Sequence, residues 1–135
     1  MSFEELPHTA DVKIRACAPS LESLFSDAFE ALMSVMYGKD RDSGIKREIS
    51  VESADNESLL ADFLSEVLFI SEIDGLVFSR ADISLDKGKL RAVVDGEPFD
   101  PSRHAGGIEV KGISYSGLAI THDTNGYILD ILFDV

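Results

Sequence analysis

Residues 127–135, YILDILFDV, give the clearest indication of the fold, because they stay apolar up to the last side chain. The ends of a domain usually fray unless other parts of the chain hold them in place. A terminal stretch this apolar therefore predicts a β-strand inside a sheet. The expected strand ends with Asp134 beside Val135, which carries the terminal carboxylate.

A second strand is expected near the other end of the chain, over residues 11–17, where valine, isoleucine and alanine occupy alternate positions. A period of two is typical of a strand with one buried face. This strand begins with Asp11. If it lies beside the last strand, Asp11, Asp134 and the carboxylate of Val135 bring three oxygen donors to one point.

Two helices are predicted between these ends. Apolar residues recur three or four positions apart from Ser20, a suitable N-terminal cap, to Gly38, which ends the pattern. A similar stripe follows a cap at Asp55 or Asn56 and ends near residues 74–75. Both stripes are typical of helices that pack one face against a core.

Most of the remaining chain is predicted to be β-strand. The expected strands cover residues 45–51, 77–85, 90–95, 108–115 and 118–121, with hairpin turns at 86–89 and at Asn125-Gly126. The order β-α-β-α followed by several strands predicts an α+β fold, with two helices packed on one face of a mostly antiparallel sheet. At this length we expect a single domain, residues 1–135.

The composition narrows the range of functions. The net charge of −13 repels phosphate backbones, so direct binding of nucleic acid is not expected, whereas cations or a basic protein partner are favoured. The single cysteine, Cys17, excludes an internal disulfide and is expected to be a buried, inert thiol. Because the sequence has neither a signal peptide nor an apolar run of about 20 residues, we expect a cytoplasmic protein with no membrane partner.

The carboxylates at the two ends are the candidate metal ligands. Hard oxygen donors prefer Ca²⁺ or Mg²⁺ to zinc, and a cation relieves the mutual repulsion of clustered carboxylates. In the alternative interpretation, Asp11 and Asp134 only mark the ends of strands. Lys111 is expected on an alternating strand, where it is either solvated or directed at the carboxylate cluster.

Short segments spread over the whole chain form an ordered set. They are HTADV at residues 8–12, SLESLF at 20–25, DGLVF at 74–78, GE at 96–97, His104, EVK at 109–111 followed by Tyr115, and FDV at 133–135. Together they resemble the archease family. The chain departs from the family pattern at residues 114–116, which are Ser-Tyr-Ser where Thr-Tyr-His is common, and at Tyr127, which stands where Trp is common.

The resemblance implies a non-catalytic protein cofactor of the RNA-splicing ligase that joins RNA ends during tRNA splicing. Such a cofactor promotes guanylylation of the ligase and its multiple turnover, with a guanine nucleotide at the joint site. The family's metal site maps onto Asp11, Asp134 and Val135, with Ca²⁺ as the usual ion and Mg²⁺ or another divalent cation as alternatives. The oxygens of Val135 would be main-chain or terminal ones, and the family's functional lysine maps onto Lys111.

Two other functions remain open at this point. A metal-dependent hydrolase or nucleotidyl-transfer enzyme would need a base beside the cation, and His8 is the nearest candidate. The other histidines, His104 and His122, are distant in sequence, and no pair has the spacing of metal ligands. Alternatively, the chain is a chaperone-like binding module for a tRNA-modifying enzyme such as a methyltransferase.

Overall fold

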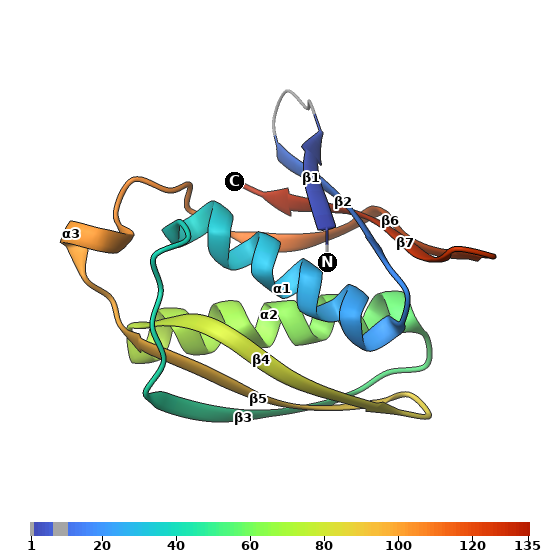
Figure 1. Ribbon diagram of the computed structural model, residues 1–135, viewed down its shortest axis with the longest axis horizontal. Helices are drawn as coiled ribbons and strands as arrows, with labels where there is room; N and C mark the ends of the chain where they lie inside the picture. Colours follow the sequence, from blue (N-terminus) through green and yellow to red (C-terminus); the bar gives the residue numbers. More distant parts are fainter. Residues whose placement is uncertain (1, 7–10) are drawn as a thin grey trace.

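The computed structural model describes residues 2–6 and 11–135. Within these residues the chain forms three layers, in which two long helices lie between two antiparallel sheets (Figure 1). The predicted α+β class and the antiparallel pairing are confirmed. Because the strands divide between two sheets, each long helix packs against strands of both.

The first sheet contains the strands from the two ends of the chain. Its strands lie in the order β1 (Ser2–Leu6), β2 (Asp11–Ala18), β7 (Gly126–Asp134) and β6 (Gly112–Asp123). The second sheet has the order β3 (Ile45–Glu52), β5 (Lys89–Pro98) and β4 (Leu76–Asp86). β2 pairs with β7, which is the arrangement that brings Asp11 and Asp134 together.

The two long helices begin and end where the sequence predicts. α1 (Leu21–Tyr37) is capped by Ser20, whose hydroxyl accepts a hydrogen bond from a backbone N–H of the first turn. α2 (Asn56–Asp74) is capped in the same way by Asp55. It ends at Gly75, whose left-handed backbone conformation favours glycine. These caps determine where the chain leaves each helix for the sheets.

The core fills the space on both sides of the helical layer. Phe29 of α1 and Phe63 of α2 stack with ring centroids 6.3 Å apart, and both side chains are almost fully buried. Ile14 and Phe133 of the first sheet and Val94 of the second are also inaccessible to solvent. The helices therefore join the two sheets through a continuous apolar interior.

Two segments of the described chain were not predicted. β1 extends the first sheet by pairing with β2, although residues 2–6 have no strong alternating pattern. A short helix, α3 (Pro101–His104), lies between the predicted strands 90–95 and 108–115. Asp100 caps it by accepting a hydrogen bond from the backbone N–H of Ser102. Proline at the first position is compatible with a helix start, so the signal was present in the sequence.

The segment before β6 is not a strand, contrary to the prediction for residues 108–115. The backbone N–H of Ile108 donates instead to the carbonyl of Val35 near the end of α1, at 2.9 Å. Gly107 permits this approach, because a Cβ there would lie 2.1 Å from the carbonyl oxygen of Met36. The segment thus crosses the end of α1 before β6 begins at Gly112.

The expectation of a buried Cys17 is wrong. Cys17 is exposed on β2, on the same outward face as Lys13 and Arg15. The period of two that identified the strand also places this residue outside. In the described part of the chain, no helix is both long enough and apolar enough to cross a membrane.

Candidate functional site

The start of β2 and the end of β7 meet at one end of the strands of the first sheet, which we call the sheet edge. Asp11 lies directly opposite Asp134 in the β2–β7 pair, and Val12 lies opposite Phe133. Val12 and Phe133 face the core, with exposures of 5% and 0%. The alternation of side chains along a strand therefore directs Asp11 and Asp134 to the outer face of the sheet. Val135 follows at once and is 39% exposed.

Gly112 completes this row of residues. It pairs with Asp134 from the other side, at the first position of β6. A Cβ at residue 112 would lie 3.7 Å from Oδ2 of Asp134, so glycine leaves open the space beside that carboxylate oxygen. Like charges directly opposite each other destabilise a sheet. The Asp11–Asp134 pair is therefore a position at which a cation would be stabilising.

Lys111 lies at the same edge, although not on a strand. The prediction that it belongs to an alternating strand is wrong, because β6 begins one residue later. Its backbone N–H donates a hydrogen bond to the main-chain oxygen of Asp134, at 2.7 Å. The structure thus holds the backbone of Lys111 against the end of β7, next to the carboxylate pair. The bond to Asp134 could not be inferred from local sequence, since its two residues are far apart in the chain.

Lys111 is one of the residues that line a pocket of about 340 Å³ between the two long helices and the segment before β6. Glu72 of α2 and Glu109 also line it, and apolar walls come from Leu68 and Val110. The residues that line the pocket therefore include one basic and two acidic ones beside apolar ones. Such a composition can receive a charged group that also has an apolar part.

The donors at the sheet edge fit a hard divalent cation, though they do not complete its coordination. Ca²⁺ takes six to eight oxygen ligands, including carboxylates, main-chain carbonyls and water. Two carboxylates come from Asp11 and Asp134. Across residues 2–6 and 11–135, no group of three histidine, cysteine, aspartate or glutamate side chains could hold a metal ion. A cation here would need main-chain oxygens, such as those of Val135, or water.

The histidines do not provide a base at this edge within the described chain. His8 falls outside the described residues. His104 is buried at the end of α3, and His122 stacks on Tyr127 near the β6–β7 turn, with centroids 4.3 Å apart. α3 and the β6–β7 turn lie at opposite ends of the molecule (Figure 1). His104 and His122 therefore cannot contribute to one metal site.

A second cluster of charges, which the sequence reading did not identify, surrounds Arg103 of α3. Its guanidinium donates to both carboxylate oxygens of Glu97, at 2.7 and 2.8 Å, and also to the carboxylates of Asp40 and Asp42. The hydrogen bonds from Arg103 are the main reason why the pKa of Glu97 falls from 4.5 to about 2. The same guanidinium lowers the pKa of Asp40. This cluster ties α3 to the loop after α1.

His104 completes that cluster from inside. Its Nδ1 accepts the backbone N–H of Asp100 at 2.9 Å, so the proton of the neutral ring is on Nε2. Nε2 lies 3.0 Å from the main-chain oxygen of Asp40 and 3.2 Å from a carboxylate oxygen of Glu97. Both ring nitrogens of His104 therefore have hydrogen-bond partners within the protein. The role of His104 is to hold α3 in place.

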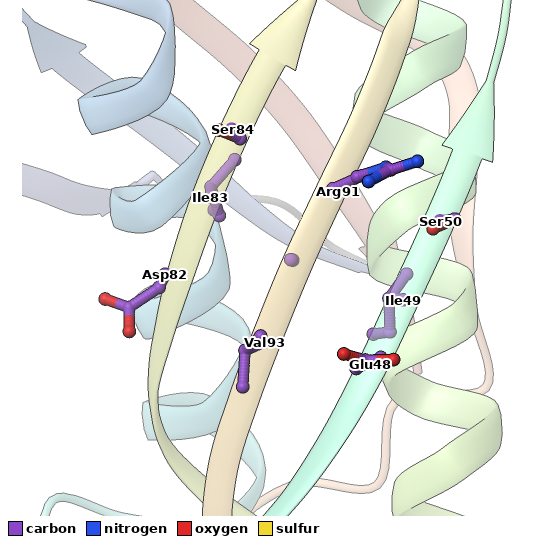
Figure 2. A pocket seen from close by; sticks show the side chains of 9 residues that line it. Glu48, Ile49, Ser50, Asp82, Ile83, Ser84, Arg91 and Val93 are labelled. Carbon is purple, nitrogen blue, oxygen red and sulfur yellow. The ribbon is translucent and has the colours of Figure 1, made fainter.

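Another pocket lies on the other side of the molecule, on the outer face of the second sheet. It has a volume of about 570 Å³ and is shallow, with Val93 at its centre and Glu48 and Asp82 on either side (Figure 2). Arg91 rises from the central strand next to them (Figure 2). This face is polar, carries both signs of charge and is separated from the Asp11–Asp134 edge by the helical layer. It contains none of the predicted site residues.

Comparisons with known proteins point to one family. The model of the archease protein family matches residues 3–135. Protein archease of Methanosarcina mazei is 32% identical over 98% of this chain and 95% of its own length. Protein archease of Methanopyrus kandleri is 34% identical over 100% of both. Protein archease of Pyrococcus abyssi is 39% identical over 87% of each chain.

Solved structures have the same architecture. The solution structure of protein 1598 from Methanobacterium thermoautotrophicum superimposes with a TM-score of 0.86, at 27% identity over 98% of both chains. The crystal structure of a Thermotoga maritima protein, described as an archease and possible chaperone, gives a TM-score of 0.69 over 98% of this chain and 96% of its own. At 19% identity, that second likeness shows the fold alone.

Proposed function

Because this chain belongs to the archease family, we propose that it is a non-catalytic protein cofactor of a tRNA-splicing RNA ligase. In this role it promotes guanylylation of the ligase and restores its turnover. The observation that carries the proposal is the convergence of Asp11, Asp134 and the backbone of Lys111 at one sheet edge. These groups come from three separate parts of the sequence.

The electrostatics of the chain support a protein partner. A net charge of −13 disfavours direct contact with an RNA backbone and accelerates encounter with a basic protein surface. In the proposed complex, RNA is held by the ligase, and the cofactor presents the sheet edge to the site where the guanine nucleotide reacts. Lys111 supplies a positive charge that can contact a phosphate oxygen.

A divalent cation, Ca²⁺ by preference, is proposed at the same edge. Asp11 and Asp134 would hold it together with main-chain oxygens of Val135, and the bound ion would supply positive charge beside Lys111. The surrounding residues hold the two carboxylates in position. Gly112 leaves space next to Asp134, and the β2–β7 pairing keeps the two carboxylates on one face.

The proposal is tested by measuring covalent GMP transfer to a purified RNA-splicing ligase, with and without this protein. We expect the parent chain to accelerate guanylylation. Lys111→Ala, Asp11→Ala and Asp134→Ala should each reduce the acceleration by at least tenfold, an effect typical of lost charge-assisted contacts near a reacting phosphate.

Asp86→Ala is a matched control, because Asp86 is an exposed aspartate at the end of β4 in the other sheet. It should accelerate guanylylation as the parent does. If the three site variants also match the parent, the sheet edge is not the functional site. If the parent itself has no effect on the ligase, the cofactor role is wrong.

A further inference from the structure

The outer side of α2 exposes two large apolar side chains next to each other. Phe69 is 56% exposed and Ile73 is 66% exposed. Residues four positions apart are neighbours on a helix surface, so these side chains form one patch. Most of the other apolar residues of α2 are buried or partly buried in the core. Isolated exposed apolar residues are ordinary, whereas adjacent ones can mark an interaction surface.

Acidic residues surround this apolar pair. Glu66 and Glu72 lie three residues before and after Phe69, on the same side of the helix. Within the described chain, neither forms an ion pair, and α2 contains no lysine or arginine. An apolar centre with a polar rim is the usual anatomy of a protein interface. When the residues of the rim all carry one sign of charge, the surface favours a partner of the opposite charge.

The dipole of α2 also favours a basic partner. The carboxyl end of a helix carries a partial negative charge that favours cations. The last turn of α2 has no basic residue and instead contains Glu72 and Asp74. Asp74 forms an ion pair with Arg47 at 3.0 Å. Glu72, for which the described residues provide no ion pair, adds negative charge at a negative helix end, which a basic partner would stabilise.

The apolar pair is continuous with the candidate functional site. Glu72 borders the patch and also lines the pocket that Lys111 lines. Leu68, one turn earlier on α2, lines the same pocket. A partner that covers Phe69 and Ile73 would therefore also cover the opening beside Lys111. No equivalent arrangement exists on the outer face of the second sheet, where charges of both signs surround Val93.

We propose that Glu66, Phe69, Glu72 and Ile73, which we call the α2 patch, form the docking surface for a basic protein. The partner would place an apolar side chain against Phe69 and Ile73 and its cations against the two glutamates. This inference rests on the proposed function, which takes the partner to be the RNA ligase. The new element is a surface that binds the partner and is separate from the groups at the sheet edge.

The test measures the dissociation constant between this protein and the purified RNA-splicing ligase by isothermal titration calorimetry at two salt concentrations. Phe69→Ser with Ile73→Ser should weaken binding by about tenfold or more, as expected for the centre of an interface. Glu66→Gln with Glu72→Gln should weaken binding at low salt and make it less sensitive to salt. The matched control is Glu48→Gln with Asp82→Asn, which should bind as the parent does.

The outcomes separate this inference from the proposed function. If the parent binds and activates the ligase while both α2-patch variants bind with parental affinity and salt dependence, the docking surface is wrong and the cofactor role stands. If the parent does not bind the ligase, both proposals are overturned. The glutamate variant keeps the apolar residues in place. It therefore still tests the docking surface if the serine variant fails to fold.

Discussion

At the scale of single residues, the candidate site depends on two aspartates placed opposite each other. Asp11 and Asp134 are cross-strand partners on the outer face of the sheet. The period of two over residues 11–17 places Asp11 on the face away from the core, and the sequence brings the two aspartates together only if the first and last strands lie side by side. The place of Lys111 could not be predicted, because its backbone is held by a hydrogen bond to Asp134 from a segment with no regular structure.

The charge repulsion between these aspartates gives a prediction for metal removal. Without divalent cations, Asp134→Asn should leave the free energy of unfolding unchanged or raise it by about 0.2–1 kcal/mol, because a like-charge cross-strand pair is removed. Adding Ca²⁺ should raise the melting temperature of the parent and leave that of the variant almost unchanged. Calorimetric melting curves in chelator and in Ca²⁺ measure both effects.

Asp86→Asn serves as the control for this experiment, since it neutralises an exposed aspartate at the end of a strand in the other sheet. Its melting temperature should respond to Ca²⁺ as the parent's does. An equal response of Asp134→Asn would mean that Ca²⁺ binds elsewhere.

At the scale of elements, α3 is held by charge rather than by apolar packing alone. Arg103 joins it to Glu97 of β5 and to Asp40 and Asp42 in the loop after α1. The sequence contains the signals for a short helix, namely Asp100 and a following proline. It does not indicate which carboxylates surround Arg103, because residues 40 and 103 meet only in the folded chain.

The lowered pKa of Glu97 predicts how stability depends on pH. Because its pKa falls from 4.5 to about 2 in the folded protein, the stabilisation is complete above pH 4.5 and is lost as the pH falls toward 2. Glu97→Gln should therefore melt a few degrees below the parent at pH 7, and the difference should shrink between pH 4.5 and 2. Thermal unfolding followed by circular dichroism at constant ionic strength measures this.

Glu48→Gln is the comparison for that series, because Glu48 is an exposed carboxylate on β3 opposite Val93. It should differ little from the parent at any pH. A constant gap between Glu97→Gln and the parent down to pH 2 would contradict the assignment of the titrating group.

At the scale of the whole molecule, the helical layer lies between the two sheets and packs against strands of both (Figure 1). We therefore expect its interior residues to contribute strongly to stability. Phe29 and Phe63 meet at its centre. Deleting a large side chain there removes apolar contacts and leaves a cavity that the two rigid sheets cannot close.

Phe63→Ala should therefore reduce the free energy of unfolding by about 3–5 kcal/mol. Phe69→Ala, on the outer side of the same helix, should change it by no more than about 0.5 kcal/mol, because that side chain is already 56% exposed. Urea unfolding of both variants provides the comparison. Similar losses would mean that Phe69 is part of the core.

The sequence by itself determined the elements with strong local signals: α1 and α2 with their caps, most strands of both sheets, and the outward direction of Asp11. These follow from periodicity and capping, which act over a few residues. Only the tertiary structure decided that the strands form two sheets, that β1 joins the first, that Lys111 lies against Asp134, and that Arg103 gathers three carboxylates. The physical reason is that an alternating pattern shows which side of a strand is buried, whereas its neighbours are chosen by packing and hydrogen bonds between distant parts of the chain.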